Sequence, residues 1–215
     1  MKTCMTWATL VVGFSLLSLG ARSEIQPPPP EDLLMELDGT IHPQRFLEVQ
    51  GEPFGHHAIV WRGGRTASRA LIVTETSDRE VADRLAALGA FGGNNLAPQA
   101  WENRKDRADP SADERVSGST VEVWVEWEGG GGSRNLAVLM GLPDAQYRFG
   151  DHRHLIPVWR SGCIVCNVSC PGGKISNRSL TIRDQTEGRL HPKLNLKDLP
   201  PDGTKVRIRL YRAGW

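Results

Sequence analysis

The chain has 215 residues and a formal net charge of +1, from 26 Lys and Arg against 25 Asp and Glu. Because the two charge signs are balanced and intermixed, the sequence lacks the basic field that nucleic-acid binding needs, and we expect no nucleic-acid partner. The length suits one domain with a sizeable hydrophobic core, and neither composition nor repeats indicate a second.

The N-terminus has the pattern of an export signal. Lys2 precedes an apolar stretch from Trp7 to Leu19, and the small-residue cleavage pattern Ala21-Arg22-Ser23 follows it. The stretch is shorter than the roughly 20 apolar residues that span a bilayer, and no other run approaches that length. We therefore predict a signal peptide over residues 1–23 and an exported protein, periplasmic or secreted, without a membrane span.

The next segment is predicted to be a linker. Residues 24–31 include four consecutive prolines, which favour an extended, semi-rigid spacer. No lipid anchor is expected, because Cys4 precedes the apolar stretch instead of standing at the cleavage site. The folded domain is then expected over residues 32–215.

The clearest strand is predicted over residues 121–127, where the valines share one face and the glutamates the other. The glycines of residues 129–132 and the apolar run 136–140 then predict a hairpin with a loose glycine loop. Further strands are predicted over residues 46–49, 58–61, 70–74, 179–182 and 205–211.

One helix is predicted, over residues 78–89. Ser77-x-x-Glu80 is a capping-box pattern, and Gly89 stands where a left-handed C-cap belongs. The apolar residues between them share one stripe: Val81, Leu85 and Leu88. Many strands and one clear helix indicate an α+β class, a β-rich single domain with a Cys-rich loop.

That loop holds the only cysteines left after the predicted signal peptide is removed, in Cys163-x2-Cys166-x3-Cys170-Pro171. The spacing overlays the last three positions of the bacterial iron–sulfur pattern C-x2-C-x2-C-x3-C-P. Arg160 stands where the first cysteine would fall. The similarity to a ferredoxin is therefore partial.

Four motifs follow one another along the chain: Gly55-His56-His57-Ala58-Ile59-Val60, Ala87-Leu88-Gly89-Ala90, Val116-Ser117-Gly118-Ser119, and Ser161-Gly162-Cys163-Ile164-Val165-Cys166 through Ser176-Asn177. In this order they resemble the YdjY family, over roughly residues 35–212. The resemblance implies an exported bacterial protein of a family sometimes labelled ferredoxin-like, with no established activity. The cysteine run carries over residue by residue, whereas the lipid-attachment cysteine of some members has no counterpart here.

Three interpretations of the cysteines stay open. Thiolates are soft ligands, so Cys163, Cys166 and Cys170 are candidate ligands for zinc or copper, with an iron–sulfur cluster less favoured because ligands are missing. In an oxidising compartment two of the three could instead form a structural disulfide and leave one spare thiol. The third interpretation is that such a thiol exchanges with the disulfide in a redox reaction, or with a partner.

A metal site would need further ligands. His152, His154 and His191 are candidates for a fourth ligand, and no spacing rule selects among them. His56 and His57 precede a predicted strand, where adjacent residues point to opposite faces, so we expect them not to share one ion. A structural or surface role is expected for this pair.

Other catalytic patterns are absent from the sequence. Pro171-Gly172-Gly173-Lys174 resembles a phosphate loop only superficially, because Ile175 stands where Ser or Thr is required. We expect its glycines to adopt positive φ angles that bring the cysteines together. With no hydrolase or nucleotide signature, we do not expect an enzyme by itself.

Two functions remain in view. The first is a metal or redox centre at the cysteines that serves electron transfer or partner chemistry. The alternative is a non-catalytic binding or scaffolding module in which the cysteines form a structural disulfide. A protein partner outside the cytoplasm is left open under both.

Overall fold

The computed structural model describes residues 26–49, 55–130 and 132–214. The predicted signal peptide therefore lies outside the described residues, as does the start of the predicted linker. No helix in the described part of the chain is long and apolar enough to cross a membrane. The ordered strands begin at Leu33, close to the predicted start of the domain.

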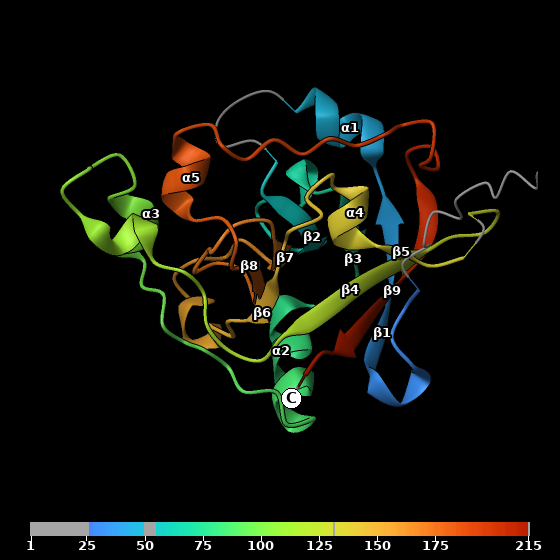
Figure 1. Ribbon diagram of the computed structural model, residues 1–215, viewed down its shortest axis with the longest axis horizontal. Coiled ribbons are helices and arrows are strands. Elements are labelled where there is room, and N and C mark those ends of the chain that lie inside the picture. The colour runs from blue at the N-terminus through green and yellow to red at the C-terminus, as the bar shows by residue number, and fades with distance from the viewer. Residues whose placement is uncertain (1–25, 50–54, 131, 215) are drawn as a thin grey trace, which may run out of the picture.

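The architecture is one mixed sheet of nine strands with short helices around it (Figure 1). The strands are β1 (Leu33–Ile41), β2 (His57–Trp61), β3 (Ile72–Thr74), β4 (Val121–Glu126), β5 (Arg134–Asn135), β6 (Tyr147–Phe149), β7 (Cys163–Cys166), β8 (Ile175–Asn177) and β9 (Thr204–Arg212). Their spatial order is β5-β4-β9-β1-β3-β2-β7-β8-β6. The β2/β3 and β7/β8 pairs are parallel, and the other pairs are antiparallel.

The sheet curls until its two ends approach each other. A bridge joins Thr120, just before β4, to Arg148 in β6 at the other end of the strand order. The Phe149 amide also donates to the Ser119 carbonyl over 2.8 Å. This curling encloses the main hydrophobic core, because strands from both ends contribute buried side chains such as Val123 and Phe149.

The helices are short except for one. They are α1 (Pro43–Glu48), α2 (Asp78–Ala87), α3 (Gln99–Glu102), α4 (Leu136–Leu139) and α5 (Ile182–Thr186), with 3-10 turns η1 (Pro30–Asp32), η2 (Ala67–Arg69), η3 (Pro110–Asp113) and η4 (Arg153–Leu155). Within the described residues, α2 alone has seven or more residues. The predicted β-rich α+β class with one clear helix is confirmed.

Helix α2 begins at the predicted residue and ends at Ala87, two residues before the predicted end. The Ser77 hydroxyl accepts a hydrogen bond from the Glu80 amide over 3.1 Å, and Gly89 has a φ of +89°. Val81 and Leu85 are fully buried. The placement of Leu88 on the buried stripe was wrong: its side chain is 50% exposed, because the helix ends at Ala87 and the chain turns away there.

Three segments that were predicted as strands lie in short helices or lead into them. Residues 46–49 lie largely in α1, which Pro43 opens with a φ angle suited to a helix start. Residues 179–182 lead into α5, whose N-cap Thr181 forms a reciprocal capping box with Asp184. The apolar run after the glycine loop is α4, so only the two residues of β5 complete the predicted hairpin with β4.

Strand β9 confirms the alternation seen in the sequence. Val206, Ile208 and Leu210 are buried, while Lys205 and Arg207 are exposed. The strand lies between β1 and β4 and pairs with both. It therefore joins the N-terminal strand to the middle of the chain and supports the half of the sheet away from the cysteines.

Candidate functional site

The three cysteines lie in and after β7. Cys163 and Cys166 are the first and last residues of that strand, and Cys170 lies in the loop that leads to β8. All three are free thiols, with relative exposures of 1%, 0% and 7%. Among the described residues, no group of three or more His, Cys, Asp or Glu side chains is arranged to hold a metal ion.

The thiols nevertheless contact one another. The Cys166 side chain lies close enough to both Cys163 and Cys170 for each of them to shift its pKa. Cys163 Sγ also lies 3.4 Å from the Val165 carbonyl oxygen, to which it donates. The sulfurs therefore form a short row with Cys166 in the middle.

The surroundings favour the protonated forms of two of these thiols. Burial raises the pKa of Cys166 well above its ordinary value, and the adjacent Cys163 raises it further. The neighbouring Cys166 is the largest cause of the raised pKa of Cys170, and burial adds to it. At neutral pH both are thiols unless a metal ion, a reaction partner or oxidation removes the proton.

Close approach of the backbone, and not a left-handed turn, shapes the glycine loop. Gly172 and Gly173 do not have positive φ angles, so the prediction for them was wrong. A Cβ atom at Gly173 would lie 2.9 Å from the Cβ atom of Cys166 and 2.4 Å from Ser176 Oγ. The positive φ in this region belongs to Gly162, at +72°, immediately before β7.

Buried polar contacts hold the loop between β7 and β8. Ser169 Oγ donates to the Asn177 carbonyl over 3.1 Å and accepts from the Val116 amide over 3.0 Å. Ser176 Oγ donates to the Cys170 carbonyl over 3.2 Å. The Asn167 amide group donates to the Gly55 carbonyl over 2.9 Å. The cysteine loop is therefore attached to both flanking parts of the chain.

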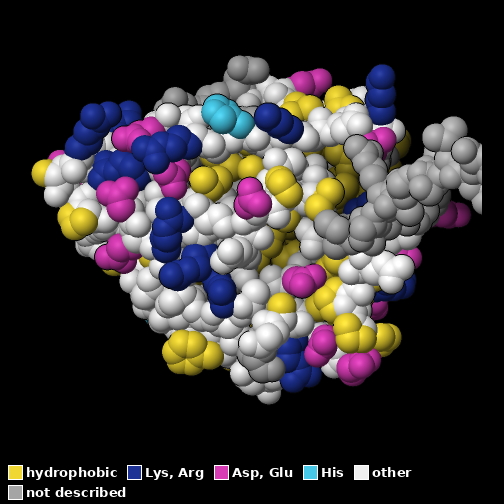
Figure 2. All heavy atoms as spheres, viewed as in Figure 1, with side chains coloured by type: hydrophobic (Ala, Val, Ile, Leu, Met, Phe, Trp, Pro, Cys, Tyr) yellow, Lys and Arg dark blue, Asp and Glu magenta, His cyan; other side chains and the backbone are white. Residues whose placement is uncertain are grey.

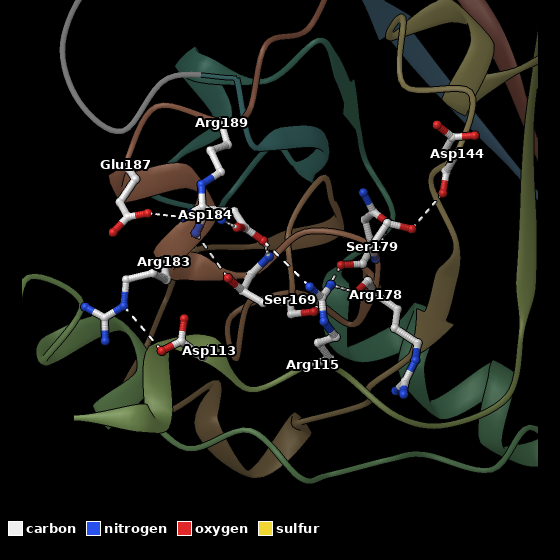
Figure 3. Close-up of polar contacts among 12 residues, drawn as sticks. Asp113, Arg115, Asp144, Ser169, Arg178, Ser179, Arg183, Asp184, Glu187 and Arg189 are labelled. Atoms are coloured by element: carbon white, nitrogen blue, oxygen red, sulfur yellow. Dashed lines mark hydrogen bonds and ion pairs between the residues drawn. The ribbon is translucent and has the colours of Figure 1, made fainter. Parts of the chain in front are cut away.

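Ion pairs join α5 to the segment that precedes β4, and Ser169 of the cysteine loop lies beside them (Figure 3). Asp184 lies 2.6 Å from Arg189 and 4.0 Å from Arg115, and Arg183 lies 3.4 Å from Asp113. These contacts place α5 beside the cysteine loop, where Leu180 accepts a backbone hydrogen bond from Ser169.

A buried lysine lies next to the thiols. Lys174 is 1% exposed; its Nζ atom donates to the Gly172 carbonyl over 3.2 Å and lies 4.0 Å from Asp78 Oδ2. Burial lowers the pKa of Lys174, and the nearby Asp78, Cys163 and Cys170 partly offset that effect. A cation this close would stabilise a thiolate at Cys163 or Cys170.

Cys170 also lines a pocket, with a volume of about 220 Å³. Its lining residues come from five segments of the chain and are His56, His57, Arg65, Thr66, Arg69, Trp101, Trp159, Arg160, Ser161, Cys170 and Gly172. The rings of Trp101 and Trp159 meet edge to face, with centroids 6.5 Å apart. Cys170 thus connects the row of thiols to a cavity open to solvent.

The two adjacent histidines meet in the same pocket. Their ring centroids are 3.7 Å apart, and both residues are buried. His56 precedes β2 and His57 begins it, so the alternation of strand faces does not separate them. Of the structural or surface role expected for this pair, burial contradicts only the surface alternative. The amide nitrogen of Gln185 lies 2.6 Å from His56 Nδ1. Burial, with a smaller contribution from the nearby Arg69, lowers the pKa of His57 to about 3.

The other histidines do not supply the predicted fourth ligand as they stand. His152 is fully buried, and its Nε2 atom accepts a hydrogen bond from the Leu96 amide over 3.1 Å. His154 and His191 are exposed. Sequence reasoning selected the three cysteines but missed Lys174, Trp101 and Trp159, which no spacing pattern links to the cysteine loop.

The comparisons with known proteins agree on one family. The model of the YdjY domain matches residues 35–211. The chain belongs to the YdjY domain family. It is also 24% identical over 156 residues to "Uncharacterized protein YdjY" of Escherichia coli strain K12; this covers 71% of the chain and 65% of that relative. The chain thus spans just under two thirds of this curated relative's length, and no solved structure matches it.

Family membership agrees with the resemblance read from the sequence, and the matched region agrees with the predicted one to within a residue. The YdjY match includes both the cysteine loop and the residues of the tryptophan-lined pocket. Neither match assigns an activity. The function must therefore be argued from the geometry of the thiols and the pocket.

Proposed function

We propose that this YdjY domain is an exported thiol redox module in which Cys166 can form a disulfide with either Cys163 or Cys170. The observation that carries the proposal is the position of the Cys166 thiol, which contacts both of the other thiols. A cysteine between two partners can transfer a disulfide from one to the other by thiol exchange. Export to an oxidising compartment, predicted from residues 1–23, is part of this proposal.

The proposed reaction is a thiol–disulfide exchange with a disulfide of a partner. The Cys170 thiolate attacks one sulfur of that disulfide, forms a mixed disulfide and releases the first partner thiolate, which takes up a proton. Cys166 then attacks Cys170 Sγ, and the second partner thiolate leaves. The partner disulfide is reduced to two thiols while Cys166 and Cys170 are oxidised to a disulfide.

The exposure of the thiols supports Cys170 as the first to attack and Cys166 as the second. Cys170 is the cysteine that lines the pocket, whereas Cys166 is fully buried behind it. Cys163 is also buried and could take over the disulfide from Cys170 by attacking Cys166. Lys174 lies close enough to Cys163 and Cys170 to stabilise the thiolate that each attack requires.

Disulfide mapping of four proteins tests the proposal. The wild type, C163S, C166S and C170S are equilibrated in dithiothreitol redox buffers, and the bonds are assigned by mass spectrometry. We expect C163S to form the 166–170 bond and C170S to form the 163–166 bond. C166S should form neither. A 163–170 bond as the major product, or no bond in any variant under oxidising buffers, would overturn the proposal.

Soft-metal binding is the second candidate, and one observation favours it. The β2/β7 register places His57 opposite Cys166, and His57 Nδ1 is buried without a hydrogen-bond partner. The low pKa keeps this imidazole neutral, which is the form that binds zinc or copper. Together with Cys163, Cys166 and Cys170 it would complete a Cys₃His ligand set after rearrangement of the side chains. Elemental analysis of the reduced wild type and of C166S tests this site. Stoichiometric metal in the wild type that is lost in C166S supports it.

A further inference from the structure

Among the hollows that the described residues line, two with several basic residues differ in how these charges are paired. One lies over α3 and α5, where Lys and Arg gather with Asp and Glu between them in Figure 2. There Arg183 pairs with Asp113, and Arg189 pairs with Asp184. These acids already neutralise much of the charge. The other hollow is the pocket beside Cys170, and none of the described residues that line it is an acid.

The rim of that pocket carries three free guanidinium groups. Arg65, Arg69 and Arg160 are exposed, and none of them has an ion pair or a side-chain hydrogen bond with the described residues. Arginine recognises carboxylate and phosphate groups through paired N–H donors. Three unpaired arginines around one opening favour an anion over a neutral or cationic ligand.

The walls of the pocket are aromatic. Trp101 and Trp159 offer indole surface within 6.5 Å of each other, and the ring of His56 lies 5.7 Å from that of Trp101. A flat or apolar group could stack against these rings. The volume of about 220 Å³ is below the 300–1,000 Å³ that is usual for ligand pockets, so the ligand must be small.

An unsatisfied polar atom gives independent support for a ligand. His57 is 7% exposed and lines the pocket, and its Nδ1 atom makes no hydrogen bond in the described structure. A buried polar group without a partner costs free energy, which a ligand can recover by hydrogen bonding to it. The pocket therefore combines anion recognition, an aromatic surface and one open hydrogen-bonding position.

We propose that this pocket is a binding site for a small organic anion that has a flat apolar body, such as an aryl phosphate or aryl carboxylate. The anionic group lies against Arg69 and Arg160, and the ring lies against the two tryptophans. The site is separate from the thiol chemistry, because none of its anion-binding groups is a cysteine. A ligand bound here would cover Cys170 and so control access to the row of thiols.

Calorimetric titration of the reduced protein tests the site with phenyl phosphate, benzoate, benzyl alcohol and benzylamine. We expect both anions to bind about tenfold or more tightly than the neutral and cationic probes. Arg69→Gln and Arg160→Gln should each weaken phenyl phosphate binding by about tenfold. Trp159→Leu should weaken phenyl phosphate but not inorganic phosphate. Far-UV circular dichroism establishes that each variant is folded.

Matched controls separate this site from general charge and from the cysteines. Arg62→Gln removes the same charge from a neighbouring exposed position that is paired with Glu75 outside the pocket, and it should leave the affinity unchanged. C166S, at a buried position that does not line the pocket, should also keep the affinity, although it removes the central thiol. Equal binding of anionic and neutral probes, no binding of either anion, or an equal loss in Arg62→Gln would overturn the proposal.

Discussion

Gly173 passes so close to Cys166 that a Cβ atom at position 173 would lie 2.9 Å from the Cβ atom of the cysteine. The backbone that follows the loop thus forms one wall around the central thiol. Because Ser176 Oγ would be only 2.4 Å away as well, no small shift of one side chain makes room for a larger residue.

Gly173→Ala should therefore destabilise the protein by about 1–3 kcal/mol through overpacking. Gly172→Ala is the matched control, since its closest contact would be Ser161 Oγ at 3.1 Å, a hydroxyl on a side chain that can rotate. Urea unfolding of the reduced proteins measures both changes. Equal losses at the two positions would contradict the close approach described for Gly173.

Alkylation should distinguish the three cysteines in the native protein. Cys170 lines the pocket and is 7% exposed, against 1% for Cys163 and 0% for Cys166. We expect iodoacetamide to modify Cys170 first, about tenfold faster than the other two, because reaction needs access as well as thiolate. Peptide mass spectrometry at partial modification gives the order. Faster labelling of Cys163 or Cys166 would contradict the position of Cys170 at the pocket.

Lys174 and Asp78 should be energetically coupled. Lys174→Met removes the cation that lies 4.0 Å from the buried Asp78 carboxylate and should cost about 2–4 kcal/mol, because it leaves that carboxylate without a counter-charge. Adding Asp78→Asn to Lys174→Met should recover part of this loss.

Urea unfolding of the two single variants and the double variant completes the cycle for this pair. The exposed Lys197→Met serves as the control and should change the free energy of unfolding by less than about 0.5 kcal/mol. Additive losses in the double variant would show that the pair is not coupled.

His152 should make stability fall as the pH is lowered. Burial lowers its pKa in the folded state to about 4, whereas the unfolded chain takes up the proton near 6.5. Between these values the unfolded state binds more protons, so stability present above pH 6.5 is lost toward pH 4. The limiting slope from one such group is about 1.4 kcal/mol per pH unit.

His152→Gln removes this titration and keeps an acceptor at the position that meets the Leu96 amide. We expect its unfolding free energy to depend less steeply on pH between 6.5 and 4.5 than that of the wild type. The measurement is a series of urea unfolding curves over this interval. Parallel pH profiles would contradict the buried neutral state of His152.

Local sequence patterns predicted the structure correctly where a short segment determines its own conformation. Helix α2 follows from its N-cap serine and C-terminal glycine, and β9 follows from strict alternation of apolar and charged residues. The set of cysteines was also foreseeable from their spacing, although strict alternation along β7 would place Cys163 and Cys166 on opposite faces. In β1 the apolar alternation of Met35, Leu37 and Ile41 is interrupted at Gly39, where a Cβ atom would lie 2.8 Å from Ile72.

By itself, the sequence determined the YdjY family, the β-rich class, the main helix and the set of cysteines, since each depends on residues close together in the chain. Only the tertiary structure decided that Cys166 is the middle thiol and that Cys170 opens into the pocket. It also brought Trp101, Trp159 and His57 together from separate segments. The physical reason is that curling of the sheet and packing of long connections create these contacts, and no local periodicity encodes them.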